Sequence, residues 1–195
     1  MNWLAHLRLA PDDKEVRLGA LLCDFARGDE LLQMPPRVSL GLAHHRAIDR
    51  FTDAHPIFAQ SRARIAAPLR RFSGVLVDVF YDHFLARDWQ AHGDGRPLRE
   101  FTAAHYALLD EYATLLPATL RRIAPQMRAY DWLASYETLA GIDDVLQRMD
   151  RRLKKSGPIA AGSAELRANY EGLDADFAAF FPQVQSFAKA PLAAT

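Results

Sequence analysis

The chain has 195 residues, of which 50% are hydrophobic and 25% are charged. This composition is typical of a globular protein with its own core, and it excludes an intrinsically disordered chain. The 24 basic and 24 acidic residues cancel, so overall charge favours neither nucleic acid nor membrane as a partner. The single cysteine, Cys23, allows no internal disulfide bond. We therefore expect a cytoplasmic protein that binds no nucleic acid and no membrane.

Helical periodicity dominates the first half of the chain. Apolar residues recur with a period near 3.6, whereas the alternation typical of strands is scarce. This pattern predicts helices over residues 16–28, 35–52, 56–67 and 74–91. We expect the first to end at Gly28, the second and third to begin at prolines, and the fourth to be strongly amphipathic.

A loop at residues 92–97 separates this half from a second helical half. The elements predicted beyond it are a helix over 98–116, a helix from Pro117, short helices near 131–153, a loop at 156–158, and a helix over 163–181 with Ser163 as its N-cap. The breaks between helices are too short for interdomain linkers. The sequence therefore predicts an all-α fold, a compact helical bundle that forms a single domain over residues 1–195.

Carboxylates and histidines are concentrated on two of these predicted helices. His45 and Asp49 are four residues apart, which places both on one helix face, and Asp53 lies one turn further along. Asp78 and Asp82 have the same spacing on the fourth predicted helix. If the two helices pack side by side, these groups point into one gap.

Three further residues extend this pattern. His83 follows Asp82 about 100° around the helix axis, Asp24 lies in an apolar run, and His6 lies near the N-terminus. A buried carboxylate is unstable without a partner, and one metal ion can satisfy several. Asp and His together suit Mn²⁺, Fe²⁺ or Mg²⁺. Spacing alone leaves a second interpretation open, in which Arg46, Arg50 and Arg27 neutralise the carboxylates as ordinary ion pairs.

The remaining histidines, the tryptophans and the cysteine have simpler interpretations. Three histidines lie in predicted turns or exposed stretches, and we expect them to be solvated: His55, His92 and His105. Core or helix packing is the expected role of the three tryptophans and of the cysteine: Trp3, Trp89, Trp132 and Cys23.

Four linked motifs stand in the first 90 residues: Asn2-x-Leu4-Ala5-His6-Leu7, Leu22-x-Asp24-Phe25-x-Arg27-Gly28, His45-Arg46-x-Ile48-Asp49-x-x-Thr52-Asp53 and Asp78-x-x-x-Asp82-His83-Phe84-Leu85. Their order and spacing resemble those of the acyl carrier protein phosphodiesterase family. The tail is similar only in its helical, aromatic-containing character, as at Tyr170-x-x-Leu173 and Phe180-Phe181-Pro182.

This resemblance implies both a fold and a reaction. The family is similar to the HD-type metal phosphohydrolases, with the helices in a rearranged sequence order. The implied reaction is hydrolysis of the 4′-phosphopantetheine arm from holo-acyl carrier protein, which yields the apo-protein and free phosphopantetheine. Manganese is the metal associated with the family, with Mg²⁺ or Fe²⁺ as alternatives.

The motif positions imply roles for individual residues. We expect most of the direct metal ligands to be Asp24, His45, Asp78 and His83. Asp49 and Asp82 would be further ligands or supporting groups, and Arg46 and Arg27 would clamp the phosphate. Residues that line the site would be His6, Arg27 and Asp53.

An acidic carrier protein requires a basic surface on its partner. Between residues 54 and 77 there are four basic residues and no acidic one: Arg62, Arg64, Arg70 and Arg71. We expect these four to bind the carrier protein. A second basic cluster is as readily a solvated helix face: Arg148, Arg151, Arg152, Lys154 and Lys155.

Two other functions remain open on the sequence alone. One is a metal phosphohydrolase that acts on a nucleotide or another small phosphoester, which would not need the basic surface. The other is a non-enzymatic helical interaction protein whose Asp and His residues form structural ion pairs.

Overall fold

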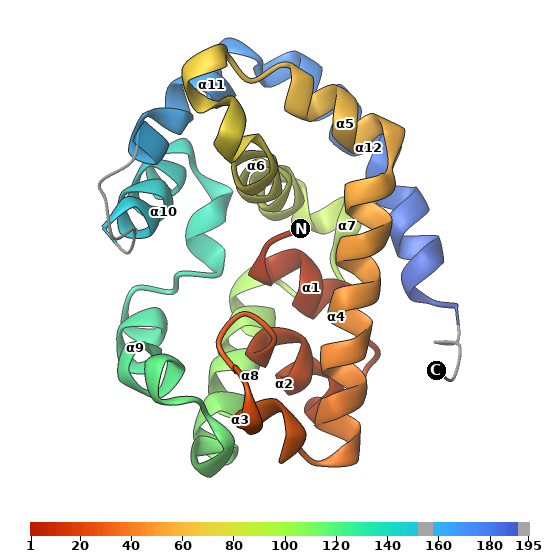
Figure 1. Ribbon diagram of the computed structural model, residues 1–195, viewed down its shortest axis with the longest axis vertical. Helices are drawn as coiled ribbons and strands as arrows, with labels where there is room; N and C mark the ends of the chain where they lie inside the picture. Colours follow the sequence, from red (N-terminus) through yellow and green to blue (C-terminus); the bar gives the residue numbers. More distant parts are fainter. Residues whose placement is uncertain (152–157, 191–195) are drawn as a thin grey trace.

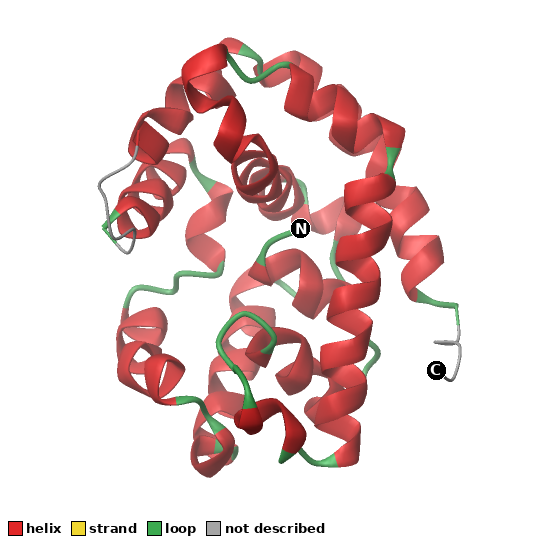
Figure 2. Cartoon of the chain, viewed as in Figure 1, coloured by secondary structure: helices red, strands yellow, loops and turns green. Residues whose placement is uncertain are grey.

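The computed structural model describes residues 1–151 and 158–190 and shows that the chain is all-α, as predicted. Over these residues every regular element is a helix and none is a strand (Figures 1 and 2). No described helix combines the length and the apolar character needed to cross a membrane. Most of the predicted loop at 156–158 lies outside the described residues. So do three residues of the second basic cluster: Arg152, Lys154 and Lys155.

The helices follow one another with short connections. The α-helices are α1 (Trp3–Leu9), α2 (Lys14–Leu22), α3 (Asp29–Leu32), α4 (Pro36–Ala54), α5 (Pro56–Ala63), α6 (Ser73–Arg87), α7 (Trp89–His92), α8 (Leu98–Glu111), α9 (Ala118–Ala129), α10 (Leu139–Asp150), α11 (Gly162–Ala168) and α12 (Tyr170–Ala188). The 3₁₀ turns are η1 (Ala67–Phe72), η2 (Ala113–Leu115), η3 (Ala134–Glu137) and η4 (Pro158–Ala161).

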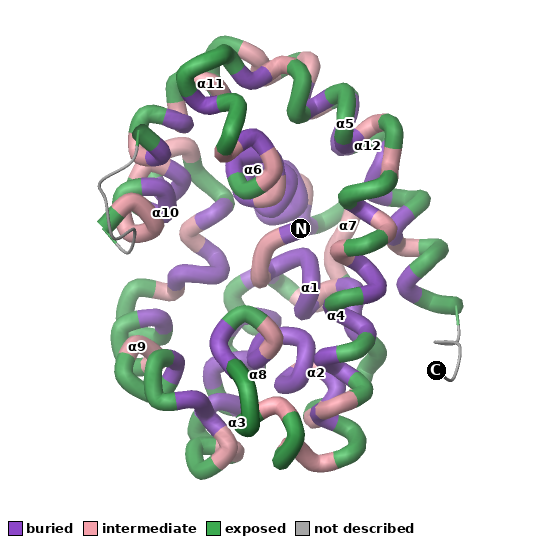
Figure 3. Tube along the Cα trace, viewed as in Figure 1, coloured by how far each residue is buried: buried purple, intermediate pink, exposed green. Residues whose placement is uncertain are grey.

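Helix α6 lies at the centre of the fold. It packs against α1, α5, α10, α12 and η3, and in Figure 1 it is seen nearly end-on between α5 and α12 on one side and α10 on the other. Its residues are buried around almost the whole circumference, as the purple tube of Figure 3 shows. The expectation of an amphipathic helix is therefore wrong, because apolar residues on all sides make α6 a core helix.

The most extensive helix pair is α2 with α4, and two glycines make it possible. A Cβ atom on Gly19 would lie 2.0 Å from the carbonyl oxygen of Val38, and one on Gly41 would lie 2.1 Å from that of Val16. Only glycine permits such a close backbone crossing. Since His45 is one turn beyond Gly41, this crossing fixes where the His45 side chain meets α2.

Three predicted boundaries are corrected by the structure. Helix α2 ends at Leu22, because the chain turns over residues 23–25, and Gly28, with φ of +54°, instead precedes α3. The helix predicted over 74–91 breaks at Asp88 into α6 and α7. The helix predicted over 163–181 is two helices, and Ser163 lies inside α11 and is not its N-cap.

The solvated character expected of three histidines is also corrected. His105 is 2% exposed, and its ring bonds the carbonyl of Phe101 at 2.6 Å. His92 is half-buried and packs edge-on against Phe177. His55 is half-buried and caps α5. All three lie on helices or helix ends that pack against neighbouring elements, a long-range effect that local sequence does not show.

Candidate metal centre and its cavity

Two histidines and one aspartate meet between α1 and α4. Nε2 of His6 lies 3.0 Å from one carboxylate oxygen of Asp49, and Nε2 of His45 lies 3.0 Å from the other. The two imidazole rings stack with centroids 3.5 Å apart and planes 9° apart. Over the described residues, this is the group of His, Cys, Asp or Glu side chains close enough to share a metal ion, with ligand atoms within 4.8 Å of one another.

The backbone of α2 orients His45. Its Nδ1 lies 2.7 Å from the carbonyl oxygen of Ala20, so the ring donates that N–H and turns Nε2 toward Asp49. Metal-binding histidines usually have such a partner, which fixes the tautomer and the ring plane. His6 is 1% exposed, and its Nε2 faces Asp49 and the carbonyl of Met1.

The electrostatics of this group suit a cation. Burial lowers the pKa of His6 to about 3, so its imidazole is neutral. Burial also acts to lower the pKa of His45, but Asp49 and Asp24 outweigh it and hold that pKa above 6.5. The two imidazoles overcome the burial of Asp49 and lower its pKa. A neutral histidine and an ionised carboxylate are the forms that bind a metal, and metal binding would displace the proton of His45.

Three more carboxylates lie beside this group, as the sequence predicts. Asp24, in the turn after α2, has one oxygen 3.5 Å from Nε2 of His45. Asp53 and Asp78 line the same cavity. Burial raises the pKa of Asp24 and that of Asp78. Asp78 also accepts a hydrogen bond of 2.6 Å from the amino group of Met1.

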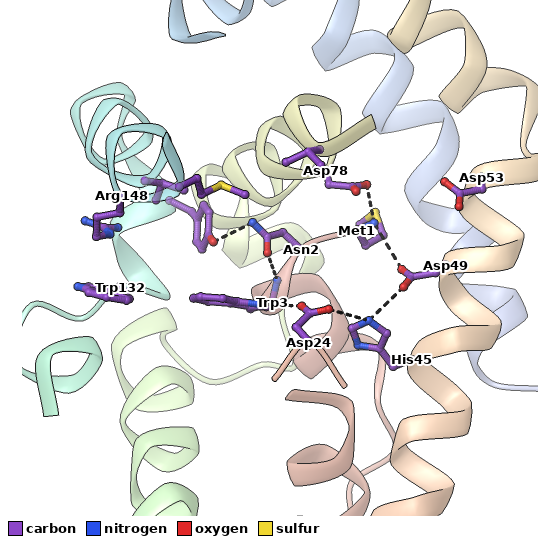
Figure 4. A pocket seen from close by; sticks show the side chains of 14 residues that line it. Met1, Asn2, Trp3, Asp24, His45, Asp49, Asp53, Asp78, Trp132 and Arg148 are labelled. Carbon is purple, nitrogen blue, oxygen red and sulfur yellow. Dashed lines mark hydrogen bonds and ion pairs between the residues drawn. The ribbon is translucent and has the colours of Figure 1, made fainter. Parts of the chain in front are cut away.

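The cavity onto which these carboxylates open has a volume of about 390 Å³, within the range of small-molecule sites. Figure 4 shows Asp24, Asp49, Asp78 and His45 at one end of it and Trp132 and Arg148 at the other. Trp3 lies between the two ends. The cavity is therefore acidic at the candidate metal centre and aromatic away from it.

Asp82 is placed behind this cavity, at the N-terminus of α1. Its carboxylate accepts hydrogen bonds from the backbone N–H groups of Leu4 at 2.8 Å and of Asn2 and Ala5 at 3.3 Å. It is 0% exposed, and burial raises its pKa to about 7. These bonds occupy the carboxylate, so Asp82 supports α1, the helix that bears His6.

His83 is not brought to the cluster, and its expected place among the ligands is corrected. Nδ1 of His83 lies 2.8 Å from the carbonyl oxygen of Tyr136, and Nε2 lies 2.9 Å from the hydroxyl of Tyr170. Both ring nitrogens thus have protein partners on η3 and α12. Adjacent residues of a helix point about 100° apart, and on α6 this separates His83 from Asp78 and Asp82.

The arginines divide into three groups. Arg46 and Arg27 are exposed and are not among the residues that line the cavity, so the structure does not place them as a phosphate clamp. Arg62, Arg70 and Arg71 are exposed, as expected of a docking surface. The guanidinium of Arg64 instead forms an ion pair with Asp176, with Nε at 2.8 Å and Nη2 at 3.2 Å from the carboxylate oxygens.

Sequence reasoning missed the aromatic end of the cavity. Trp3 and Trp132 were expected only in packing roles, yet both line the cavity, together with Tyr136, Arg148 and Met149. Trp3 could have been found, because it stands inside the motif that contains His6. The other residues come from distant parts of the chain and carry no local signal.

Comparisons with known proteins cover nearly the whole chain. A family model described as acyl carrier protein phosphodiesterase matches residues 1–184. Three relatives of that name, from Yersinia enterocolitica, Yersinia pestis and Escherichia coli, are 33%, 34% and 34% identical over 189, 182 and 187 residues. The matches cover 97%, 93% and 94% of this chain and 98%, 94% and 95% of the relatives. No solved structure gives a significant match.

Proposed function

The chain belongs to the acyl carrier protein phosphodiesterase family, and we propose that it hydrolyses the 4′-phosphopantetheine arm from holo-acyl carrier protein. Water would attack phosphorus, the bond to the serine oxygen would break, and the serine would leave with a proton. A cavity of about 390 Å³ joins the His6–His45–Asp49 cluster to an aromatic wall and supports this function. The cytoplasm is the proposed compartment.

We propose that His6, His45, Asp49 and Asp24 hold the metal, with Mn²⁺ as the ion. When bound, such an ion lowers the pKa of a water and offsets the charge on the phosphoryl oxygens. The donor set supports this choice, because nitrogen and carboxylate oxygen donors without thiolates suit Mn²⁺, Fe²⁺ or Mg²⁺. Asp78 is the proposed general base, since burial raises its pKa and it lines the cavity.

The carrier protein would dock beside the cavity mouth. The exposed Arg70 and Arg71 lie in η1, which leads directly into α6. Val75, in the first turn of α6, is exposed and lines the cavity. An acidic partner bound to these arginines would therefore present its modified serine near the metal centre. Arg62 belongs to the same surface, whereas Arg64 contributes less because Asp176 already pairs with it.

The test is incubation of the purified protein with holo-acyl carrier protein and Mn²⁺, followed by intact-protein mass spectrometry. We expect the mass of the arm to be lost, and a chelator to prevent the loss. His45→Ala should abolish release. The matched control is His44→Ala, because His44 is the adjacent buried histidine of α4 but bonds the carbonyl of Ala188 instead. Absence of release by the wild-type protein, or full activity of His45→Ala, would contradict the proposal.

Salt dependence separates this function from the small-phosphoester alternative. A protein substrate steered by Arg70 and Arg71 should show a KM that rises with ionic strength. A nucleotide substrate bound only in the cavity should not depend on these exposed side chains. The helical interaction protein is tested by metal analysis, since it should contain no stoichiometric manganese or iron.

A further inference from the structure

The aromatic end of the cavity presents no carboxylate or imidazole, and it is built from four separate parts of the chain. Trp3 comes from α1, Trp132 from the segment after α9, Tyr136 from η3 and Met149 from α10. Tyr136 is 2% exposed and Trp132 is 7% exposed. Packing in the core therefore holds these side chains in place, so the wall is already formed and can bind a ligand without rearrangement.

Hydrogen bonds connect this wall to the metal centre. The indole Nε1 of Trp3 donates to Asp24 at 2.8 Å, and the side-chain amide of Asn2 donates to the hydroxyl of Tyr136 at 3.0 Å. In Figure 4 the indoles of Trp132 and Trp3 lie in line and lead to Asp24. A ligand whose phosphoryl group sits at the metal centre would thus extend along the two indoles.

Arg148 lies at the far end of this path. Its guanidinium carbon is 4.5 Å from the ring centroid of Trp132, and the residue lines the cavity. Arginine presents N–H donors in one plane, while the indoles, together with Val145 and Met149, present apolar surface. The path therefore suits an extended, uncharged chain that has both aliphatic groups and carbonyl acceptors.

We propose that Trp3, Trp132 and Arg148 form a subsite for the pantetheine part of the prosthetic group, an inference that rests on the function proposed above. The pantetheine chain has a dimethyl group and two amides, which match the apolar wall and the guanidinium donors. The carrier protein itself stays outside, on the arginine surface. The subsite thereby selects the arm, and the arginines select the protein that bears it.

The experiment measures binding and does not depend on turnover. Isothermal titration of the Mn²⁺-loaded protein would compare 4′-phosphopantetheine with inorganic phosphate. We expect the wild-type protein to bind phosphopantetheine at least about tenfold more tightly, since burying one large apolar group is worth that much. Trp132→Leu removes the indole, and Met149→Trp fills the path without creating a cavity. Both should reduce this preference to about threefold or less and leave phosphate affinity unchanged.

Tyr130→Leu is the matched control, because Tyr130 is 74% exposed beside Trp132 and does not line the cavity. It should retain the full preference. Equal binding of the two ligands by the wild-type protein would overturn the subsite, as would a full preference in Met149→Trp. If Trp132→Leu weakened the binding of apo-acyl carrier protein but not of phosphopantetheine, the wall would contact the protein and the proposal would fail. If the protein bound 4′-phosphopantetheine tightly but did not release it from holo-acyl carrier protein, the proposed function would fail and the subsite would stand.

Discussion

The Asp49 carboxylate is the group on which the candidate metal centre most depends. Its two oxygens are each 3.0 Å from one histidine Nε2, so it links His6 to His45. The substitution Asp49→Asn keeps the shape of the side chain but removes one charged oxygen donor. Loss of groups that merely support metal ligands costs about 10–100-fold in affinity. We therefore expect loss of this ligand to weaken Mn²⁺ binding by at least about 100-fold.

The assay is Mn²⁺ titration of chelator-treated protein, with the dissociation constant as its readout. The matched control is Asp53→Asn, because Asp53 lies one turn further along α4 and lines the same cavity but is outside the three-residue cluster. If Asp49 is a ligand, Asp53→Asn should stay within about threefold of the wild-type affinity.

Two results would contradict the assignment of Asp49 as a metal ligand. Wild-type affinity in Asp49→Asn would show that the cluster does not bind the ion. An equal loss in Asp49→Asn and Asp53→Asn would show that the ion responds to the summed negative charge of the cavity and not to defined ligands.

Three further predictions concern the rest of the chain. His83→Leu should keep stoichiometric metal but lower the free energy of unfolding by roughly 1–3 kcal/mol, because it removes the ring's bonds to the carbonyl of Tyr136 and the hydroxyl of Tyr170. Metal analysis and urea unfolding check this, and loss of the metal would restore His83 as a ligand. Burial lowers the pKa of His105 from 6.5 to about 4, so below pH 6.5 the unfolded chain binds a proton that the folded protein does not. The contribution of neutral His105 to the free energy of unfolding is therefore complete above pH 6.5 and is lost as pH falls toward 4. In His105→Phe the free energy of unfolding should therefore fall by roughly 2 kcal/mol less between pH 7 and pH 5 than in the wild-type protein. An equal fall in the two proteins, measured by urea unfolding, would contradict this prediction. Charge reversal at Arg70 and Arg71 should raise the KM for holo-acyl carrier protein about tenfold at low salt and less at high salt; an unchanged KM at low salt would exclude this docking surface.

Helical spacing predicted the part of the site that lies on one helix. His45 and Asp49 share a face of α4 because four residues make nearly one turn, and the structure places both at one cavity. The same rule failed on α6. A helix buried on all sides has no outer face to fix its rotation, so the sequence could not tell that Asp78 faces the cavity while His83 faces Tyr136.

The aromatic wall was beyond the reach of local patterns for a different reason. Trp3 and Trp132 are far apart in the sequence, and each has the apolar neighbours of an ordinary core residue. Only the packing of α1, η3 and α10 around α6 brings them to one cavity. Arg64 shows the same limit, since its partner Asp176 comes from the other end of the chain. Long-range pairing decides such roles, and a single sequence carries no signal for it.

The placement of Asp82 explains how α6 can support the metal centre without supplying any of the four proposed ligands. Helix α1 has seven residues, and so short a helix is unstable by itself. Asp82 bonds the N–H groups of Leu4 and Ala5 in its first turn, where a helix needs acceptors. His6 follows directly and is therefore held by a carboxylate that does not contact it. Loss of Asp82 should then lower stability and metal affinity together, whereas loss of His83 should lower stability alone.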